Sequence, residues 1–181
     1  MKLTPKEIVQ ILQMEATTDS KRRERWIKNQ DTLMEIHDML IIPYQGIALI
    51  DAQLVIEDKN IVDGNPTGFK GDLGPHLTQS YLWVLGAYEI IRTMSQYANK
   101  GRDTKISQFK DEIRDLKHTF ERLRIPLAKF EAARKNPEGH TYAYPIFDKS
   151  LGTCWSISNT EFISRRLLSD SFLEVMEKLS N

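Results

Sequence analysis

KISQFKDEIRDLKHTFERLRIPLAKFE, residues 105–131, is the stretch that decides the fold of this chain. Its apolar residues recur at alternating steps of three and four, which places them in one narrow stripe along a long helix. Burial of the stripe cannot by itself offset the entropy of ordering the helix. We therefore predict that this helix packs lengthwise on another helix, either of the same chain or of a second copy. The stripe consists of Ile106, Phe109, Ile113, Leu116, Phe120, Leu123, Leu127 and Phe130.

Pro126 lies inside this predicted helix. A proline in a helix removes one backbone donor, and its ring crowds the carbonyl group four positions earlier, here that of Arg122. The stripe stays in phase beyond the proline, at Leu127 and Phe130. We therefore expect a kink at Ile125 and not the end of the helix.

Residues 76–98 supply the partner that is nearest in the sequence. Their apolar side chains cover more than half of the circumference of a helix, which is typical of a helix with neighbours on several sides. Asn99, Lys100 and Gly101 then make a short break. Because short connections favour antiparallel neighbours, we expect 76–98 and 105–131 to form a central helix hairpin.

The first third of the chain also reads as helical. Residues 4–15 have the capping pattern and spacing of a short amphipathic helix, and a second helix is expected from Asp19 or Ser20 to about Leu40, ended by Pro43. Residues 46–61 fit either a helix or a short buried strand, and we favour the helix. The Gly- and Pro-rich residues 63–75 predict a long surface loop.

Residues 141–158 change from helical to alternating periodicity, which predicts a β-hairpin around a loop at 148–152. Pro145 cannot donate a backbone hydrogen bond, so its strand should lie at the edge of the sheet. Ser158 and Glu161 have the spacing of a capping box. We expect them to begin the last helix.

These elements predict a single, mainly α domain over residues 1–181. We expect a bundle of about five or six helices, built around the 76–98 and 105–131 hairpin. The helix of 105–131 should be kinked at Pro126. The small β-hairpin of 141–158 should precede the C-terminal helix.

The composition limits the classes of partner that we expect this chain to bind. Lys and Arg together number 25, as do Asp and Glu, so no overall charge attracts nucleic acid or anionic lipid. The chain is 40% hydrophobic and 28% charged, which is typical of a soluble globular protein. The apolar run 81–88 is too short to span a bilayer, and Lys6 and Glu7 stand where a signal peptide needs its apolar segment. We therefore expect a cytoplasmic protein without a membrane partner.

The sequence contains few motifs that could bind a metal or a cofactor. The single cysteine, Cys154, excludes an intramolecular disulfide and zinc motifs built from paired cysteines. Asp115 and His118 have the spacing of a carboxylate–histidine metal pair, but a di-iron site needs a second pair, which the sequence lacks. Phosphate loops, Rossmann glycines and Gly-x-Ser-x-Gly motifs are also absent. We expect neither a metal nor a cofactor.

Glu89 and Arg92 are three positions apart in the middle of the most apolar predicted helix, and they are our candidate for a buried polar pair. Buried charges have to be paired, so a retained pair would suggest a function. The alternative, which we favour, is that both residues lie on a solvated polar strip of the helix.

A basic cluster surrounds Trp26. Its cations could contact phosphates while the ring stacks on a base, so a nucleic-acid-binding regulator is one alternative function, with RNA as its partner. The other interpretation is a solvated helix face, because Glu24 dilutes the charge. The basic residues are Lys21, Arg22, Arg23, Arg25 and Lys28.

Arg134 and His140 are separated by five residues beyond the end of the predicted helix 105–131. This spacing resembles the Arg-x4-6-His motif of HEPN ribonucleases, metal-independent helical-bundle enzymes of toxin and anti-phage systems. The resemblance covers that motif and the bundle class. It implies that His140 acts as acid or base on a ribose 2′-hydroxyl group while Arg134 steadies the phosphate, which makes a ribonuclease the other alternative function.

A stable bundle in which no catalytic site stands out most often serves in assembly. Our first hypothesis is therefore a helical interaction module without its own catalytic site. It would form a homo-oligomer or bind a protein partner through an exposed apolar strip.

Overall fold

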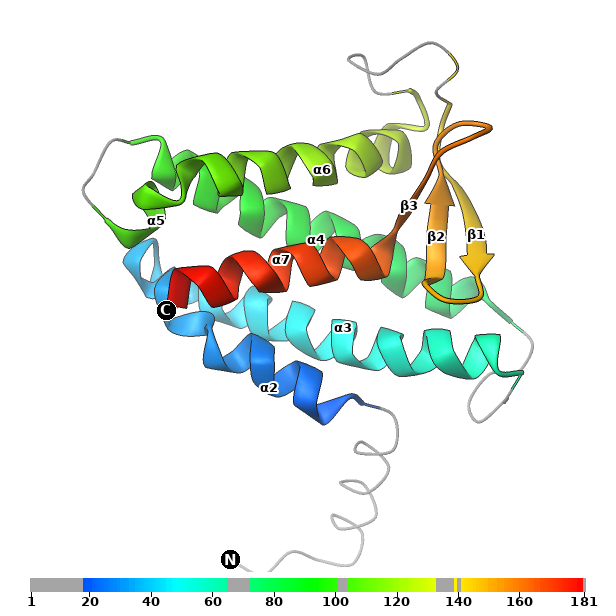
Figure 1. The fold of residues 1–181 in the computed structure, drawn as a ribbon, viewed down its shortest axis with the longest axis horizontal. Helices are drawn as coiled ribbons and strands as arrows, with labels where there is room; N and C mark the ends of the chain where they lie inside the picture. Colours follow the sequence, from blue (N-terminus) through cyan, green and yellow to red (C-terminus); the bar gives the residue numbers. More distant parts are fainter. Residues whose placement is uncertain (1–17, 65–71, 101–103, 133–138, 140, 181) are drawn as a thin grey trace, which may run out of the picture.

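The structure, a computed structural model, describes residues 18–64, 72–100, 104–132, 139 and 141–180. This part of the chain is mainly helical, with a small three-stranded sheet before the C-terminal helix (Figure 1), which confirms the predicted fold class. The α-helices are α2 (Ser20–Lys28), α3 (Ile41–Val62), α4 (Gly74–Ala98), α5 (Lys105–Gln108), α6 (Lys110–Lys129) and α7 (Arg165–Ser180). Two 3-10 helices, η1 (Gln30–Glu35) and η2 (Asp38–Leu40), link α2 to α3, and the strands are β1 (Tyr144–Asp148), β2 (Gly152–Ser156) and β3 (Phe162–Ser164).

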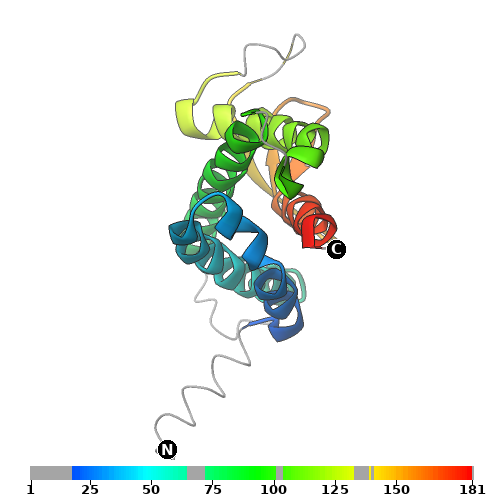
Figure 2. The same ribbon diagram turned by 90° about the vertical axis from the view of Figure 1, so that its left-hand side faces the viewer.

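Five of the helices form a closed bundle. Helix α4 packs on α6 and on α3, α3 packs on α2, and α7 packs on both α2 and α6. The end-on view in Figure 2 shows the same circular order. Aromatic rings in edge-to-face contact fill part of its interior, which adds to the stabilisation from apolar burial. They belong to Trp26, Tyr44, Phe120 and Phe172.

Most of the predicted stripe is buried in the core between the helices. The helix is not continuous, because α5 ends at Gln108 and the N–H of Phe109 turns to the carbonyl of Ile106. The prediction for Phe130 is wrong: this residue follows the last residue of α6, its φ is left-handed at 52°, and its side chain is 76% exposed. The buried members of the stripe are Ile106, Ile113, Leu116, Phe120, Leu123 and Leu127.

Helix α6 continues through Pro126 to Lys129, so the prediction that the proline does not end the helix is confirmed. The neighbouring helices supply the packing that holds the chain in phase across the missing donor. The kink expected at Ile125 stays a prediction.

The expected helix from 19 or 20 to 40 is wrong in its second half. Helix α2 ends at Lys28, because Asn29 turns its side-chain amide back to the carbonyl of Arg25 and its backbone N–H to Trp26. Pro43 does not stop a helix but lies in the first turn of α3, where no backbone donor is needed. The helix at 46–61 is confirmed. Residues 4–15 lie outside the described residues.

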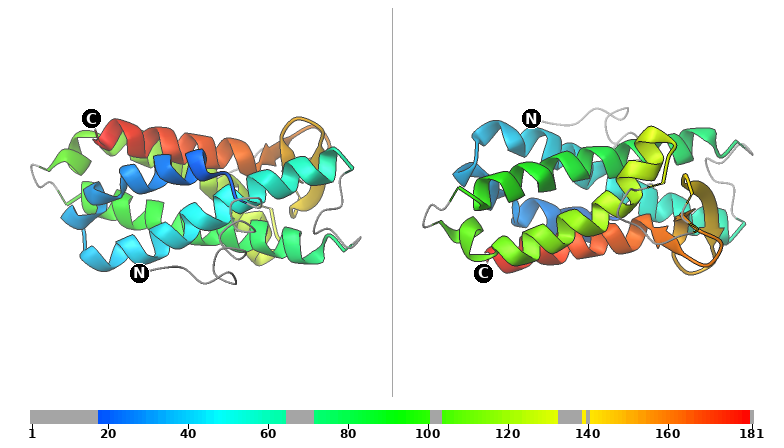
Figure 3. Two further views of the ribbon diagram at one scale, coloured as in Figure 1. Left: turned by 90° about the horizontal axis from the view of Figure 1, so that it is seen from below. Right: turned by 90° about the horizontal axis from the view of Figure 1, so that it is seen from above.

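The sheet has the order β1-β2-β3, and both neighbouring pairs are antiparallel. Pro145 lies on an edge strand, as predicted, but β3 was not expected. Ser158 caps a turn instead of a helix, since its Oγ accepts from the backbone N–H of Glu161, four positions before the first residue of α7. Ser164 caps α7, because its Oγ accepts a hydrogen bond from the backbone N–H of Leu167. Figure 3 shows that the sheet lies at one end of the bundle.

Within the described residues, one helical segment is long and apolar enough, by length and composition alone, to cross a membrane: Asp38–Val62. Core helices of soluble proteins meet the same criteria. This segment carries two buried carboxylates, Asp51 and Asp58, which bind other elements of the bundle.

Candidate functional site

Asp51 and Asp58 are seven positions apart on α3, so two helical turns place both on one face. That face points into the bundle. The side chain of Asp51 is 0% exposed and that of Asp58 is 8% exposed. A carboxylate buried this deeply has to be matched by donors or cations. Both residues are matched, by partners from four other elements.

Asp51 joins α3 to α2 and α7. Its Oδ2 accepts from Arg22 Nε at 2.5 Å and from Trp26 Nε1 at 2.9 Å, and its Oδ1 accepts from Arg165 Nη1 at 2.8 Å. Burial opposes ionisation, but the charges of Arg165 and Arg22 outweigh it and lower the pKa of Asp51. The carboxylate is therefore ionised between two buried arginines.

Asp58 joins α3 to α7 and to the sheet. Its Oδ2 accepts from Arg165 Nη2 at 2.7 Å, while its Oδ1 accepts from Thr153 N at 2.9 Å and Thr153 Oγ1 at 2.7 Å. Burial again opposes ionisation, yet the hydrogen bond from His76 and the charge of Arg165 lower the pKa of Asp58 to about 2. One guanidinium group thus bridges both carboxylates.

His76, in the first turn of α4, extends the cluster to the protein surface. Its Nδ1 lies 2.7 Å from Glu57 Oε2, and its Nε2 lies 2.7 Å from Thr153 Oγ1 and 3.0 Å from Asp58 Oδ1. Burial would lower the pKa of His76, but the hydrogen bonds to Asp58 and Glu57 raise it. The imidazolium can donate from both nitrogens, which fits carboxylates on both sides.

The charges alternate in sign along a continuous line through the bundle. One end is Glu57, whose side chain is 43% exposed, and the other is Asp170, which lies 2.7 Å from Arg22 and is 36% exposed. We call this line the charge network. In order, it contains Glu57, His76, Asp58, Arg165, Asp51, Arg22 and Asp170.

The geometry of the charge network suits holding elements together more than reacting with a substrate. An acid or base has to reach the group whose proton it moves. Here the central charged groups bind one another and are at most 8% exposed. Arg165 Nε is buried without a hydrogen-bond partner among the described residues, and the guanidinium lies 5.8 Å from the centre of the Trp83 ring.

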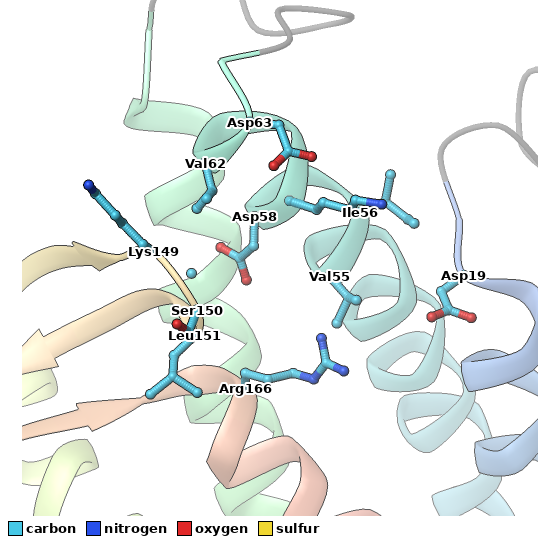
Figure 4. A pocket seen from close by; sticks show the side chains of 12 residues that line it. Asp19, Val55, Ile56, Asp58, Val62, Asp63, Lys149, Ser150, Leu151 and Arg166 are labelled. Atoms are coloured by element: carbon cyan, nitrogen blue, oxygen red, sulfur yellow. The ribbon is translucent and has the colours of Figure 1, made fainter.

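An open pocket of about 400 Å³ lies beside Asp58, between α3, the β1–β2 turn and α7. Figure 4 shows Arg166 extending across it and the carboxylate of Asp63 turned towards it. Lys59 and Lys149 also line the pocket, so cations and carboxylates are mixed. This lining does not select a ligand of one charge.

The described residues contain no group of three or more His, Cys, Asp or Glu side chains placed to hold a metal ion. His118 is exposed and binds Glu121 at 2.9 Å, while Asp115 lies beside Arg114. Cys154 is buried, and burial raises the pKa of its thiol to about 11. It therefore remains protonated and is a weak nucleophile.

The predicted basic cluster does not form one surface. Arg22 is 4% exposed and belongs to the charge network, while Trp26 is 0% exposed and packs on Tyr44 and Phe172. Neither is available to a phosphate or a base in this structure. Lys21, Arg23, Arg25 and Lys28 are exposed, and Arg25 binds Glu177 at 2.8 Å.

Glu89 and Arg92 are not part of the charge network. Glu89 and Arg92 do pair, at 2.7 Å, but their side chains are 49% and 39% exposed, so they are not a buried pair. They lie on the solvated strip of α4. Arg134 and His140 fall outside the described residues.

Comparison with known proteins gives no match among protein families, curated proteins or solved structures. The function therefore has to be inferred from the geometry of this chain.

The charge network predicts a pH dependence of stability. The folded-state pKa of His76 is raised above its ordinary value of 6.5, so its contribution is complete below about pH 6.5 and is lost as pH rises through the folded pKa. We expect the free energy of unfolding to fall over that range by at most about 1.4 kcal/mol per pH unit.

Urea unfolding of the wild type and of His76→Gln, from pH 6 to 9, measures this slope. The difference between the two proteins isolates His76 from His37 and His118, which are exposed. Parallel pH profiles of wild type and variant would show that His76 does not carry the effect.

Proposed function

We propose that the protein is a helical interaction module that self-associates through the outer face of its small sheet. The observation that supports this proposal is a set of aromatic and apolar side chains on that face which each keep more than a third of their surface exposed. We call it the aromatic face. It consists of Tyr142, Tyr144, Ile146 and Phe162, which are 42%, 48%, 38% and 46% exposed.

The strand register explains why these side chains share one face. Tyr144 pairs with Ser156, and Ser156 pairs with Phe162, so the three lie in one row across the sheet. Ile146 is two positions along β1 from Tyr144 and therefore points to the same side. The ring of Tyr142 lies 4.4 Å from that of Tyr144, and their hydroxyl groups are hydrogen-bonded.

The opposite face of the sheet is fixed to the bundle. Thr153 and Trp155 of β2 point to this opposite face, and Thr153 donates twice to Asp58. Trp155 belongs to the hydrophobic core. The charge network thus holds the sheet in place and leaves its aromatic face towards solvent.

A second copy is the partner that this face fits best. The side chains of the aromatic face carry no charge, so the face can pair with itself about a two-fold axis without opposing like charges. Pro145 lies on β1 and lacks a backbone donor, which disfavours the addition of a further strand at that edge. Face-to-face packing of two sheets remains, and tyrosine and phenylalanine are well suited to it.

We expect the wild type to have a mass of twice the 21.0 kDa chain at micromolar concentration. Tyr144→Ser combined with Phe162→Ser should weaken association about tenfold or more, because buried aromatic residues dominate interface energies. Sedimentation equilibrium over a concentration series measures the mass of the wild type and the dissociation constants of both proteins.

Leu82→Ser is the matched control, because Leu82 is 55% exposed on α4 and lies outside the aromatic face. It should leave the mass unchanged. A wild type that stays at 21.0 kDa throughout, or an equal effect of Leu82→Ser, contradicts the proposal.

A further inference from the structure

Helix α3 carries a line of apolar side chains on the side that faces away from the bundle. Ile42, Leu49 and Ile56 are seven positions apart, so they follow one another along one side of the helix. Asp51 faces into the bundle, and two positions along an α-helix correspond to a rotation of about 200°, which places Leu49 on the opposite side. Ile42 is 63% exposed, and the other two are partly exposed. We call Ile42, Leu49 and Ile56 the α3 stripe.

The α3 stripe differs from an ordinary solvated helix face, which carries charged residues. Within residues 41–56 the one charged residue is Asp51, and it is buried. Of the most apolar part of Asp38–Val62, 39% is buried inside the structure. A helix that is apolar on all sides is normally covered on all sides. The α3 stripe should therefore have an apolar partner.

The start of the described chain is attached to α3 beside this stripe. The backbone N–H of Asp19 donates to the carbonyl of Ala52 at 3.0 Å. Ala52 is three positions after Leu49 and four before Ile56, so it neighbours both on the helix surface. Asp19 and Ile56 also line the same pocket (Figure 4). The residues that precede Asp19 in the sequence are thus joined to the bundle next to the α3 stripe.

Residues 4–15 lie outside the described residues, and their sequence predicts a short amphipathic helix. Such a helix would be about 18 Å long, and the α3 stripe extends over about 21 Å. An isolated helix of this length is only marginally stable in water, so it needs a surface to pack on. Its apolar side would contain Ile8, Ile11 and Leu12, and its opposite side Lys6, Gln10 and Gln13.

The connection between this segment and the bundle is short. Only residues 16–18 separate Glu15 from Asp19. The four steps from Glu15 to Asp19 span at most about 14 Å when extended, and packed helices lie about 8–10 Å apart. A segment on so short a connection has an effective concentration in the millimolar range. A second copy in micromolar solution competes poorly with it for the same surface.

We propose that the α3 stripe binds residues 4–15 of the same chain. The side chains of Ile8, Ile11 and Leu12 pack on the stripe, and the polar side of the segment faces solvent. The segment thereby adds a further helix to the bundle, on the outside of α3. This contact is separate from the aromatic face, which lies on the sheet, and it requires no second copy.

Hydrogen exchange of the full-length protein, measured by mass spectrometry after digestion, tests the contact. The amides of residues 4–15 should exchange at least about tenfold more slowly in the wild type than in the double variant Ile8→Ser with Ile11→Ser, because only a docked segment is protected. Ile42→Ser should also accelerate exchange in 4–15, although it lies on another helix.

Two control variants accompany this experiment. Gln10→Ser with Gln13→Ser places the same serines on the polar side of the segment and should change exchange in 4–15 little. Leu82→Ser removes an exposed apolar side chain from α4 and should leave it unchanged. Circular dichroism checks that each variant is folded.

Disulfide formation distinguishes the same chain from a second copy. Leu49→Cys is combined in turn with Ile8→Cys, Ile11→Cys and Leu12→Cys, in a chain that also carries Tyr144→Ser and Phe162→Ser to prevent association through the aromatic face. On mild oxidation at least one pair should form a bond within one chain, which keeps the mass of 21.0 kDa. Pairs with Gln10→Cys or Gln13→Cys should react at least about tenfold more slowly. Cys154 is buried and does not compete.

Three results overturn the proposal. The first is exchange in residues 4–15 that is as fast in the wild type as in the Ile8→Ser, Ile11→Ser variant. The second is equal cross-linking from the apolar and polar sides of the segment. The third is a cross-link that joins two chains, because a second copy then covers the α3 stripe.

Discussion

Asp51→Asn should lower the free energy of unfolding by about 3–5 kcal/mol, the range for removing one partner of a buried ion pair. The substitution keeps the shape of the side chain but removes its charge. Arg22 and Arg165, which are 4% and 0% exposed, then face each other without the carboxylate that separates them. The NH2 group of the asparagine would also face donors: either Arg22 and Trp26, or Arg165.

Urea unfolding at pH 7 measures the loss, with far-UV circular dichroism to confirm that the variant folds. Glu89→Gln is the matched control, because it also neutralises one carboxylate of a pair in a helix, but at 49% exposure. Exposed pairs contribute about 1 kcal/mol or less. Similar losses in the two variants would contradict the role assigned to Asp51.

The sequence was sufficient to predict the bundle because the signals that specify it are local. Apolar residues at steps of three and four depend only on helical geometry, so the stripe of 105–131 located a helix and the face it buries. The boundaries were less certain. The break at Phe109 and the end of α2 before Asn29 depend on hydrogen bonds to nearby carbonyls. A continued helix would have similar energy, so the sequence does not fix these boundaries.

The charge network was missed for a different reason. Polar residues in an apolar stretch of sequence are the informative ones, but Glu89 and Arg92 prove to lie on the exposed side of α4. Asp51 gave the better signal, because it stands in the run 41–56, which has no other charged residue. Its partners Arg22 and Arg165 are 29 and 114 positions away, and only the tertiary fold brings them together.

The sequence also does not predict which face of the sheet is exposed. An alternating strand pattern shows which residues share a face, but it does not show which face the bundle covers. Thr153 turns inward to Asp58, and this places Tyr144 and Ile146 outward although both are apolar. A polar residue therefore faces the interior, and aromatic residues face solvent.

Gly152→Ala should be the second strongly destabilising change, by about 2–5 kcal/mol, from left-handed strain and overpacking together. Gly152 has φ of 68°, and a Cβ atom built there would lie 2.3 Å from Asp58 Cγ. The methyl group can be accommodated only if β2 moves away from α3. That movement stretches both hydrogen bonds from Thr153 to Asp58, so the sheet loosens from the charge network.

Substitutions at two other glycines separate the effect of backbone strain from that of overpacking. Gly64 has a similar φ of 65°, and no atom of the described residues lies within 4 Å of its added Cβ, so Gly64→Ala should show the backbone strain alone, about 1–2 kcal/mol. Gly46 lies in α3 with open space around it, and Gly46→Ala should stabilise the protein by about 0.5–1 kcal/mol. Urea unfolding of the three variants ranks these effects. If Gly152→Ala costs no more than Gly64→Ala, the close approach of β2 to Asp58 is not what positions the sheet.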